Sequence, residues 1–314
     1  MKLDIRSILT DTKKLTKLLI AVGVLLVVAI IAFGGYYYYD RFYSAKPTKM
    51  DLTIKAAEKT LAEDPGNNNK RLDLAQLYLV NSRFNDAIQY TNQVLLSDAN
   101  NQQGWLILGL AYAMKGEPAA AVEPLQKYYD ANKNGDMPGL NRTLQTSAYY
   151  LGDSYLKLGQ PDKAIEPLEN DVKWSKTDAD AMYKLGLVYT EVKNYSDAIA
   201  MFTFSTAFVP DYREAYEGMA KVYTLTQKPE LVDYAQGMVA YSKKDYKTAT
   251  DLLLKSAQVK SDFAPTFAGL GLAYEASGEL QKSIGAFETA LKLDQYNLTA
   301  QQGRQRVETL SNKK

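Results

Sequence analysis

Few side chains in this sequence could carry out covalent chemistry. The chain has 314 residues, and none of them is histidine or cysteine. The commonest general base, the commonest metal ligand and a thiolate nucleophile are therefore all lacking. A hydrolase would need a serine–lysine pair or paired carboxylates in a pocket, and nothing in the sequence marks such a pocket. We predict that the protein is not an enzyme and holds no cofactor or metal.

The motifs that come nearest to a catalytic or phosphate site have structural explanations. Asp178 and Asp180 stand at the start of a predicted helix, where acidic side chains interact favourably with the helix dipole. The sequence GLGLAY, from Gly269, opens no turn from a strand into a helix, so it does not indicate a phosphate loop. The net charge of +1 argues against nucleic-acid binding. We expect neither nucleic acid nor a small-molecule ligand.

An apolar segment near the N-terminus is long enough to cross a membrane. Residues 18–33 contain no charged or strongly polar side chain, and the apolar character continues to residue 39. A helix over residues 18–39 spans roughly 33 Å, which matches the hydrocarbon core of a bilayer. Tyrosine suits the membrane–water interface, and lysine suits the flank of a span. The predicted interface residues are Lys13, Lys14, Lys17, Tyr36, Tyr37, Tyr38 and Tyr39.

Two other interpretations of this segment are less well supported. A cleaved signal peptide would share the basic start and apolar run, but this run is long and no clear A-x-A site follows it. A buried core helix would show a polar face.

The charges around the span give a small bias in orientation. Five basic side chains lie before the span, within positions 1–17, and four lie after it, within positions 40–55. This difference favours a cytoplasmic tail over residues 1–17 and a translocated main domain after a linker at residues 40–49. We expect a single-pass membrane protein whose large domain is extracytoplasmic, either periplasmic or on the cell surface.

The rest of the chain repeats small residues and tyrosines at a fixed spacing. Each small residue is followed three positions later by a tyrosine, and the steps from Ala75 to Gly109 and from Gly152 through Gly186 to Ala220 are all equal. Small residues let two helices approach closely, while large apolar ones fill the space beside them. The pairs are Ala75 and Tyr78, Gly109 and Tyr112, Gly152 and Tyr155, Gly186 and Tyr189, Ala220 and Tyr223, and Gly271 and Tyr274.

This pattern resembles the tetratricopeptide repeat, a helix–turn–helix unit of about 34 residues, and the equal steps match the length of that unit. The resemblance covers most of residues 50–294 and implies an all-α protein, in which about six helix hairpins form a solenoid with a right-handed superhelix. Residues 51–63 are expected to form a helix that begins the stack. Residues 295–314 are expected to form a capping helix and a tail.

The repeat is broken twice. The step from Gly109 to Gly152 is longer than one repeat, and the excess falls in residues 130–142, an Asn- and Gly-rich segment that predicts an inserted loop. Such a loop is either a binding element or a tolerated insertion. After Tyr223 the pattern returns half a repeat late, which predicts an additional helix at about residues 230–241 and a bend or packed subdomain there.

The resemblance implies that the first helix of each repeat lines a concave groove for a peptide segment or an amphipathic helix. One family subclass grips a terminal carboxylate of chaperones with Lys and Asn, but Leu72 and Gln76 stand at those positions, so this clamp is absent. The alternative is that these side chains pack against neighbouring repeats. The candidate groove residues are Leu72, Gln76, Leu79, Leu106, Leu110, Met114, Tyr149, Asp153, Leu156, Tyr183 and Leu187.

These features favour a membrane-anchored scaffold or adaptor. It would bind a protein partner through the groove and support the assembly or stability of an extracytoplasmic or membrane complex. The main alternative is a chaperone for translocated polypeptides beside a secretion channel. An anchored receptor on an organelle surface and a carrier of a small ligand are further alternatives.

Overall fold

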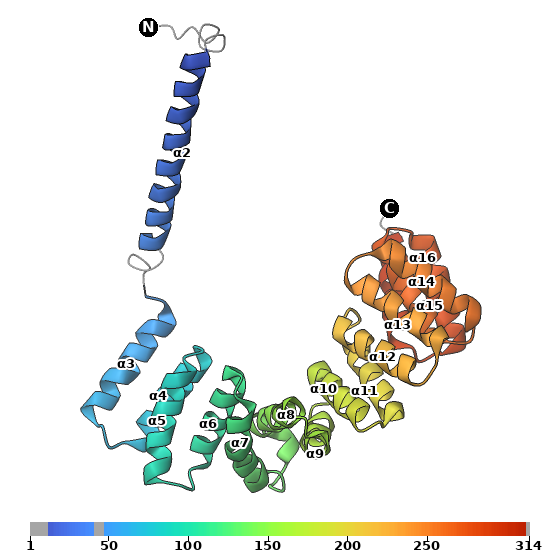
Figure 1. The fold of residues 1–314 in the computed structure, drawn as a ribbon. Coiled ribbons are helices and arrows are strands. Elements are labelled where there is room, and N and C mark those ends of the chain that lie inside the picture. Colours follow the sequence, from blue (N-terminus) through green and yellow to red (C-terminus); the bar gives the residue numbers. More distant parts are fainter. Residues whose placement is uncertain (1–11, 41–46, 312–314) are drawn as a thin grey trace. The chain divides into compact units, whose positions relative to one another are not determined.

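The computed structural model describes residues 12–40 and 47–311. Those residues form sixteen α-helices, one short 3-10 helix and no strand, so the predicted all-α fold is confirmed (Figure 1). Most of the predicted N-terminal tail, most of the linker and the last three residues lie outside the described part. The chain divides into two compact units, and the boundary between them falls between residues 63 and 64.

The first unit contains α2 (Thr12–Tyr39) and α3 (Lys49–Glu63). Within α2, Leu15–Tyr39 has a mean hydropathy of 2.9 and no buried residue, so its length and composition suit a membrane span. A signal sequence would meet the same criteria.

The predicted interface residues lie at the two ends of α2. Lys13 and Lys17 are exposed near its start, and the side chain of Lys14 lies outside the described part. The four tyrosines at its end are 55–67% exposed.

Helix α3 begins with a reciprocal cap. The backbone N–H of Thr48 donates to the Asp51 carboxylate at 2.8 Å, and the backbone N–H of Asp51 donates to the Thr48 hydroxyl at 3.1 Å. This arrangement satisfies backbone donors that have no partner inside the helix. The placement of α3 at the start of the repeat stack stays a prediction.

The second unit is a stack of antiparallel helices in chain order (Figure 1). Each helix packs against the next, and α4 also contacts α6, α6 contacts α8, α8 contacts α10 and α10 contacts α12. The helices are α4 (Asn68–Val80), α5 (Phe84–Ser97), α6 (Gln102–Lys115), α7 (Pro118–Asn132), α8 (Arg142–Lys157), α9 (Pro161–Trp174), α10 (Ala179–Glu191), α11 (Tyr195–Phe208), α12 (Arg213–Leu225), α13 (Pro229–Ser242), α14 (Tyr246–Val259), α15 (Ala264–Ala276), α16 (Leu280–Leu293) and α17 (Leu298–Ser311).

Close approach within each helix pair explains the repeated small residues. A Cβ atom added at Gly152 would lie 2.4 Å from Cγ of Leu168, and one added at Gly271 would lie 2.4 Å from Cδ1 of Phe287. These separations are far below van der Waals contact, so only glycine fits. The turn at Gly116 has a φ of 87°, which glycine adopts at little cost.

The inserted segment is shorter and better packed than a loop over residues 130–142. Helix α7 continues to Asn132, a 3-10 turn spans Pro138–Leu140, and α8 begins at Arg142. The Gln145 side chain donates to the Gly139 carbonyl at 2.7 Å. The 3-10 turn also contacts α9, so the insertion packs on its own repeat.

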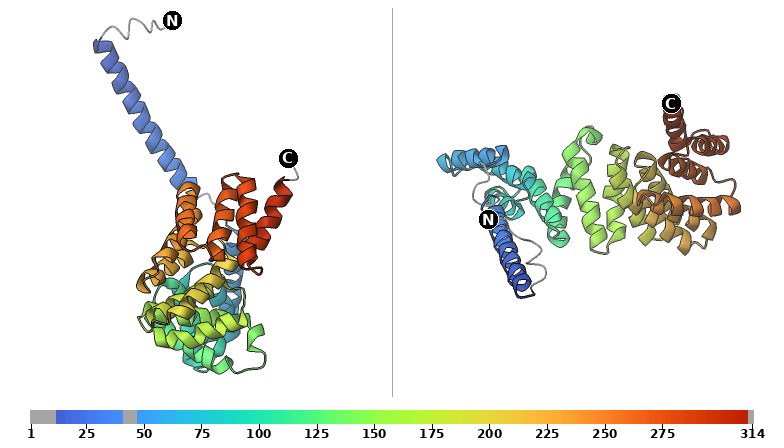
Figure 2. Two further views of the ribbon diagram at one scale, coloured as in Figure 1. Left: turned by 90° about the vertical axis from the view of Figure 1, so that its right-hand side faces the viewer. Right: turned by 90° about the horizontal axis from the view of Figure 1, so that it is seen from above.

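The second break contains a complete helix, α13. It packs against α12 and α14, and it contacts α15 in the way that α12 contacts α10. Two helices of the first type therefore follow one another, which accounts for the half-repeat shift in the sequence. A single apolar core continues through this region, from Phe202 on α11 to Phe287 on α16 and Val307 on α17. Helix α17 packs against α15 and α16 at the end of the stack (Figure 2).

Candidate functional site

The predicted groove residues of the first two helix pairs are mostly buried. Leu72, Leu79, Leu106 and Leu110 are 2%, 4%, 7% and 9% exposed, because they pack into the core of the stack. These four side chains are not available to a partner, which corrects the expectation of an apolar groove there. Gln76 and Met114 are exposed.

The predicted residues on α8 and α10 lie at a more accessible surface. Tyr149, Leu156, Tyr183 and Leu187 are half-buried, and each combines packing with an exposed edge. Half-buried aromatic side chains of this kind are enriched in protein interfaces. Among the predicted groove residues, those on α8 and α10 are therefore more accessible than the four buried leucines, and a binding role for them stays a prediction.

Asp153, on α8, is engaged within the protein. It is 5% exposed, and its carboxylate forms ion pairs with Lys157 at 2.7 Å and with Lys184 at 2.6 Å. Burial alone would raise the pKa of Asp153, but the hydrogen bonds and charges of the two lysines outweigh burial and hold its pKa below the ordinary value. Since Lys184 belongs to α10, Asp153 joins two neighbouring first helices.

A tyrosine extends this surface toward α12. The Tyr212 hydroxyl donates to Oδ1 of Asp180 at 2.5 Å, and its ring centroid lies 5.2 Å from that of Tyr183. Burial and the hydrogen bond to Asp180 raise the pKa of Tyr212 well above its ordinary value, so the hydroxyl keeps its proton and remains a donor. These contacts hold the rings in fixed positions.

A cleft of about 700 Å³ opens beside this surface, bordered by α8, α9 and α10. Tyr149 and Asp180 line it, together with Asp171 from α9. Asp171 is 1% exposed, and its Oδ2 atom has no hydrogen-bond partner among the described residues. Burial, with a smaller contribution from the charge of Asp178, raises the pKa of Asp171 to about 7.

The sequence pattern of α9 indicates that Asp171 is unusual. The groove positions implied by the family resemblance lie on first helices, so they do not include Asp171. On α9, the buried residues Ala164, Leu168 and Asp171 follow a helical spacing of four and three. A carboxylate therefore occupies a core position of a second helix. An acidic residue at an apolar position of a second helix is the sequence signal for this carboxylate.

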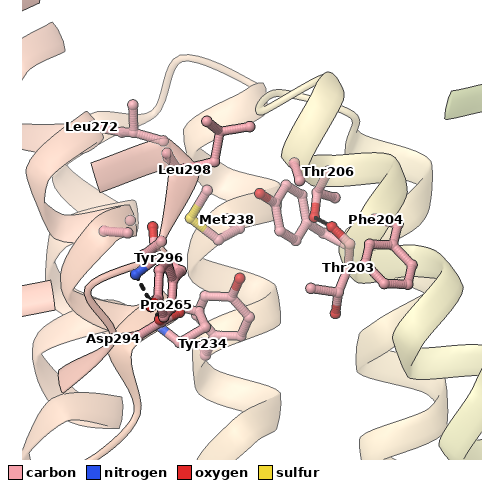
Figure 3. Close-up of a pocket in the computed structure, with 16 residues that line it drawn as sticks. Thr203, Phe204, Thr206, Tyr234, Met238, Pro265, Leu272, Asp294, Tyr296 and Leu298 are labelled. Carbon is pink, nitrogen blue, oxygen red and sulfur yellow. Dashed lines mark hydrogen bonds between the residues drawn. The ribbon is translucent and has the colours of Figure 1, made fainter. Parts of the chain in front are cut away.

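A second cleft, of about 280 Å³, lies at the half-repeat shift. Figure 3 shows Thr203 and Phe204 of α11 on one side and Tyr296 and Leu298 on the other. Its lining is mostly apolar, and Phe204 and Tyr296 are 52% and 79% exposed. None of the predicted groove residues lines it.

Comparison with known families and proteins identifies the repeats. The family described as tetratricopeptide repeat matches residues 72–136 and 264–297, and that described as anaphase-promoting complex, cyclosome, subunit 3 matches residues 140–204. Over 262 residues the chain is 22% identical to Superkiller protein 3 of Schizosaccharomyces pombe, covering 74% of this chain and 19% of that protein. The chain thus spans about a fifth of the length of this relative.

The solved structure of YrrB shares the fold. YrrB, described as a TPR protein with an unusual peptide-binding site, matches with a TM-score of 0.50 at 18% identity, over 72% of this chain and 99% of its own. MamA matches with a TM-score of 0.45 at 24% identity, over 62% of this chain and 95% of its own. Repeats of this kind generally mediate interactions between proteins.

The raised pKa of Asp171 predicts a specific dependence of stability on pH. The folded protein binds more protons than the unfolded chain between pH 3.8 and about 7, so the free energy of unfolding should fall as pH rises through this range and then level off. The size of this contribution is about 4 kcal/mol. Asp171→Asn should remove it, as measured by urea denaturation of the full chain in detergent from pH 4 to pH 8.

Asp251→Asn is the matched control. Asp251 lies on α14 in an exposed pair with Lys247, so this variant removes an equal charge without removing a buried carboxyl. Its pH profile should run parallel to that of the unaltered protein. A parallel profile for Asp171→Asn as well would contradict the prediction.

Proposed function

Because the chain belongs to the tetratricopeptide repeat family, we propose that it is a membrane-anchored, non-enzymatic scaffold that binds a protein partner on the surface formed by α8, α10 and α12. The repeats of this family generally serve as interaction scaffolds rather than catalysts. The single observation that supports this surface most strongly is its set of half-buried tyrosines, of which Tyr183 and Tyr212 are in ring contact and Tyr212 is also hydrogen-bonded to Asp180.

The surface combines the features that a peptide-binding face needs. Tyr149, Tyr183 and Tyr212 each offer an apolar ring with a polar hydroxyl, and ordering such a side chain costs little conformational entropy. The ion pair between Asp153 of α8 and Lys184 of α10 holds these helices together before any partner binds. A surface that is already ordered loses less entropy on binding, which increases its affinity.

Helix α2 would hold this surface beside a bilayer. Its apolar side chains are exposed along Leu15–Tyr39, and a lipid environment would bury them. Anchoring raises the effective concentration of the scaffold for any partner in the same membrane. We place the repeats outside the cytoplasm, in a complex whose assembly or stability the scaffold supports.

A chaperone for translocated polypeptides is the second candidate function. The observation that favours it is the exposed apolar group on α11 and just after it, where Phe204, Phe208 and Val209 are 52%, 43% and 38% exposed. Exposed apolar surface binds unfolded segments of many sequences. A scaffold would bind one or a few partners, whereas a chaperone would bind many unfolded polypeptides.

Site-specific photo-crosslinking in membranes of the native cells tests the scaffold. With p-benzoylphenylalanine at Tyr183, irradiation should give one or a few discrete products. The same group at Lys247, a side chain 88% exposed on α14, should not give these products. A broad ladder of products at position 183 would indicate the chaperone instead, and products that are the same at both positions would contradict a binding surface on α10.

Thiol labelling tests the proposed orientation. The chain has no cysteine, so Ser7→Cys and the exposed Gln302→Cys each provide a single thiol. A membrane-impermeant maleimide should label Gln302→Cys in intact cells or spheroplasts, and it should label Ser7→Cys only after lysis. Labelling of Ser7→Cys alone would reverse the orientation. Recovery of a shortened chain without the N-terminal segment would show a cleaved signal peptide.

A further inference from the structure

The cleft between α8, α9 and α10 contains a carboxylate that the protein itself does not satisfy. Asp171 is 1% exposed and lines the cleft, yet its Oδ2 atom has no hydrogen-bond partner in the described part of the chain. Asp153 is similarly buried, but two lysines neutralise it. An unpaired buried carboxylate is costly, so its position beside an open cleft indicates that a partner supplies the missing group.

The remaining walls of the cleft suit a cation. Tyr149, Tyr150 and Trp174 line it, and the first two rings meet edge to face with centroids 5.3 Å apart. Aromatic faces attract cations. Asp178 and Asp180 add further carboxylates at the start of α10.

Both of these carboxylates keep part of their accepting capacity. Oδ1 of Asp178 accepts the backbone N–H of Ala181 at 3.0 Å, and Oδ1 of Asp180 accepts the Tyr212 hydroxyl. A carboxylate has two oxygen atoms and can accept more than one hydrogen bond. The cleft therefore offers acceptors at more than one position.

The two basic residues of the cleft do not neutralise Asp171. Arg142 and Lys176 are exposed, and no ion pair within the described residues joins either of them to Asp171. A metal ion is a poor alternative, because no group of three or more Asp or Glu side chains in the described residues comes close enough to hold one. An organic cation matches the combination of one deep carboxylate and several rings.

We propose that this cleft receives an arginine side chain of the protein partner, with the guanidinium paired to Asp171 and in contact with Tyr149 and Trp174. This inference rests on the proposed function, since it names the chemistry that the scaffold recognises. Arginine fits better than lysine because its planar guanidinium donates two parallel hydrogen bonds to one carboxylate, is less strongly hydrated and stacks on aromatic rings.

Short blocked peptides test the proposal on the full chain in detergent. Trp105→Phe leaves Trp174 as the single tryptophan, because the sequence has two. The peptide acetyl-Gly-Ser-Arg-Ser-Gly-amide should cause a saturable change in Trp174 fluorescence. The lysine version should bind more weakly, and the norleucine and glutamate versions should give no saturable change.

The effect of Asp171 should appear in affinity and in its pH dependence. Asp171→Asn should weaken binding of the arginine peptide by about tenfold or more, and binding to the parent protein should be about tenfold tighter at pH 8 than at pH 6 as the carboxyl ionises. Asp178, Asp180, Arg142 and Lys176 are retained in this variant, so the difference isolates Asp171. Asp251→Asn should bind like the parent protein.

Three results would overturn the arginine site. The first is equal binding of the arginine and norleucine peptides to the parent protein. The second is an unchanged affinity of Asp171→Asn for the arginine peptide. The third is a saturable change in Trp174 fluorescence on addition of calcium chloride alone. The first does not depend on how any Asp171 variant folds.

Crosslinking at position 183 separates this inference from the proposed function. If the crosslinked products form at full yield in Asp171→Asn, the proposed scaffold function is supported and the proposed arginine site is contradicted. If the arginine peptide binds as expected but the parent protein gives no crosslinked product in membranes, arginine binding by the cleft is supported and the proposed scaffold function is contradicted.

Discussion

The second unit depends on close contact between a residue without a side chain and a large side chain in the facing helix. A Cβ atom at Gly109 would lie 2.6 Å from Leu125, and one at Gly186 would lie 2.6 Å from the ring of Phe202. The pairs that contain such a glycine are thereby brought together at a fixed separation, and successive pairs stack in register. This register places Asp153 of α8 opposite Lys184 of α10 and fixes the face on which we propose that a partner binds.

The sequence predicts the repeat architecture because small residues recur where two helices approach closely, and tyrosines recur three positions after them. The sequence does not predict which of the candidate groove side chains are exposed to solvent. Leu72 and Leu106 occupy groove positions by analogy, but leucine serves equally well in a core, and the neighbouring helices cover both. The resemblance does not predict Asp171, because this residue lies on a second helix, where the resemblance implies no binding residue.

Asp153 and Asp171 are both buried carboxylates, but their surroundings differ. Asp153 is paired inside the protein, so its charge contributes to the packing of α8 against α10. Oδ2 of Asp171 has no hydrogen-bond partner among the described residues, so ionisation of this carboxyl should destabilise the folded chain. We propose that Asp171 gains a partner on binding, since residues that reduce the stability of the free protein are common at functional sites.

Amide hydrogen exchange tests most directly whether a partner covers α8, α10 and α12. Exchange would be compared between the protein in its native membranes and the same protein purified in detergent. Exchange in segments within residues 142–157 and 179–191 should be slower in the membranes, whereas exchange in α16 should be the same in both preparations. Equal exchange throughout the second unit, or slower exchange confined to α13–α17, would contradict a binding surface on these helices.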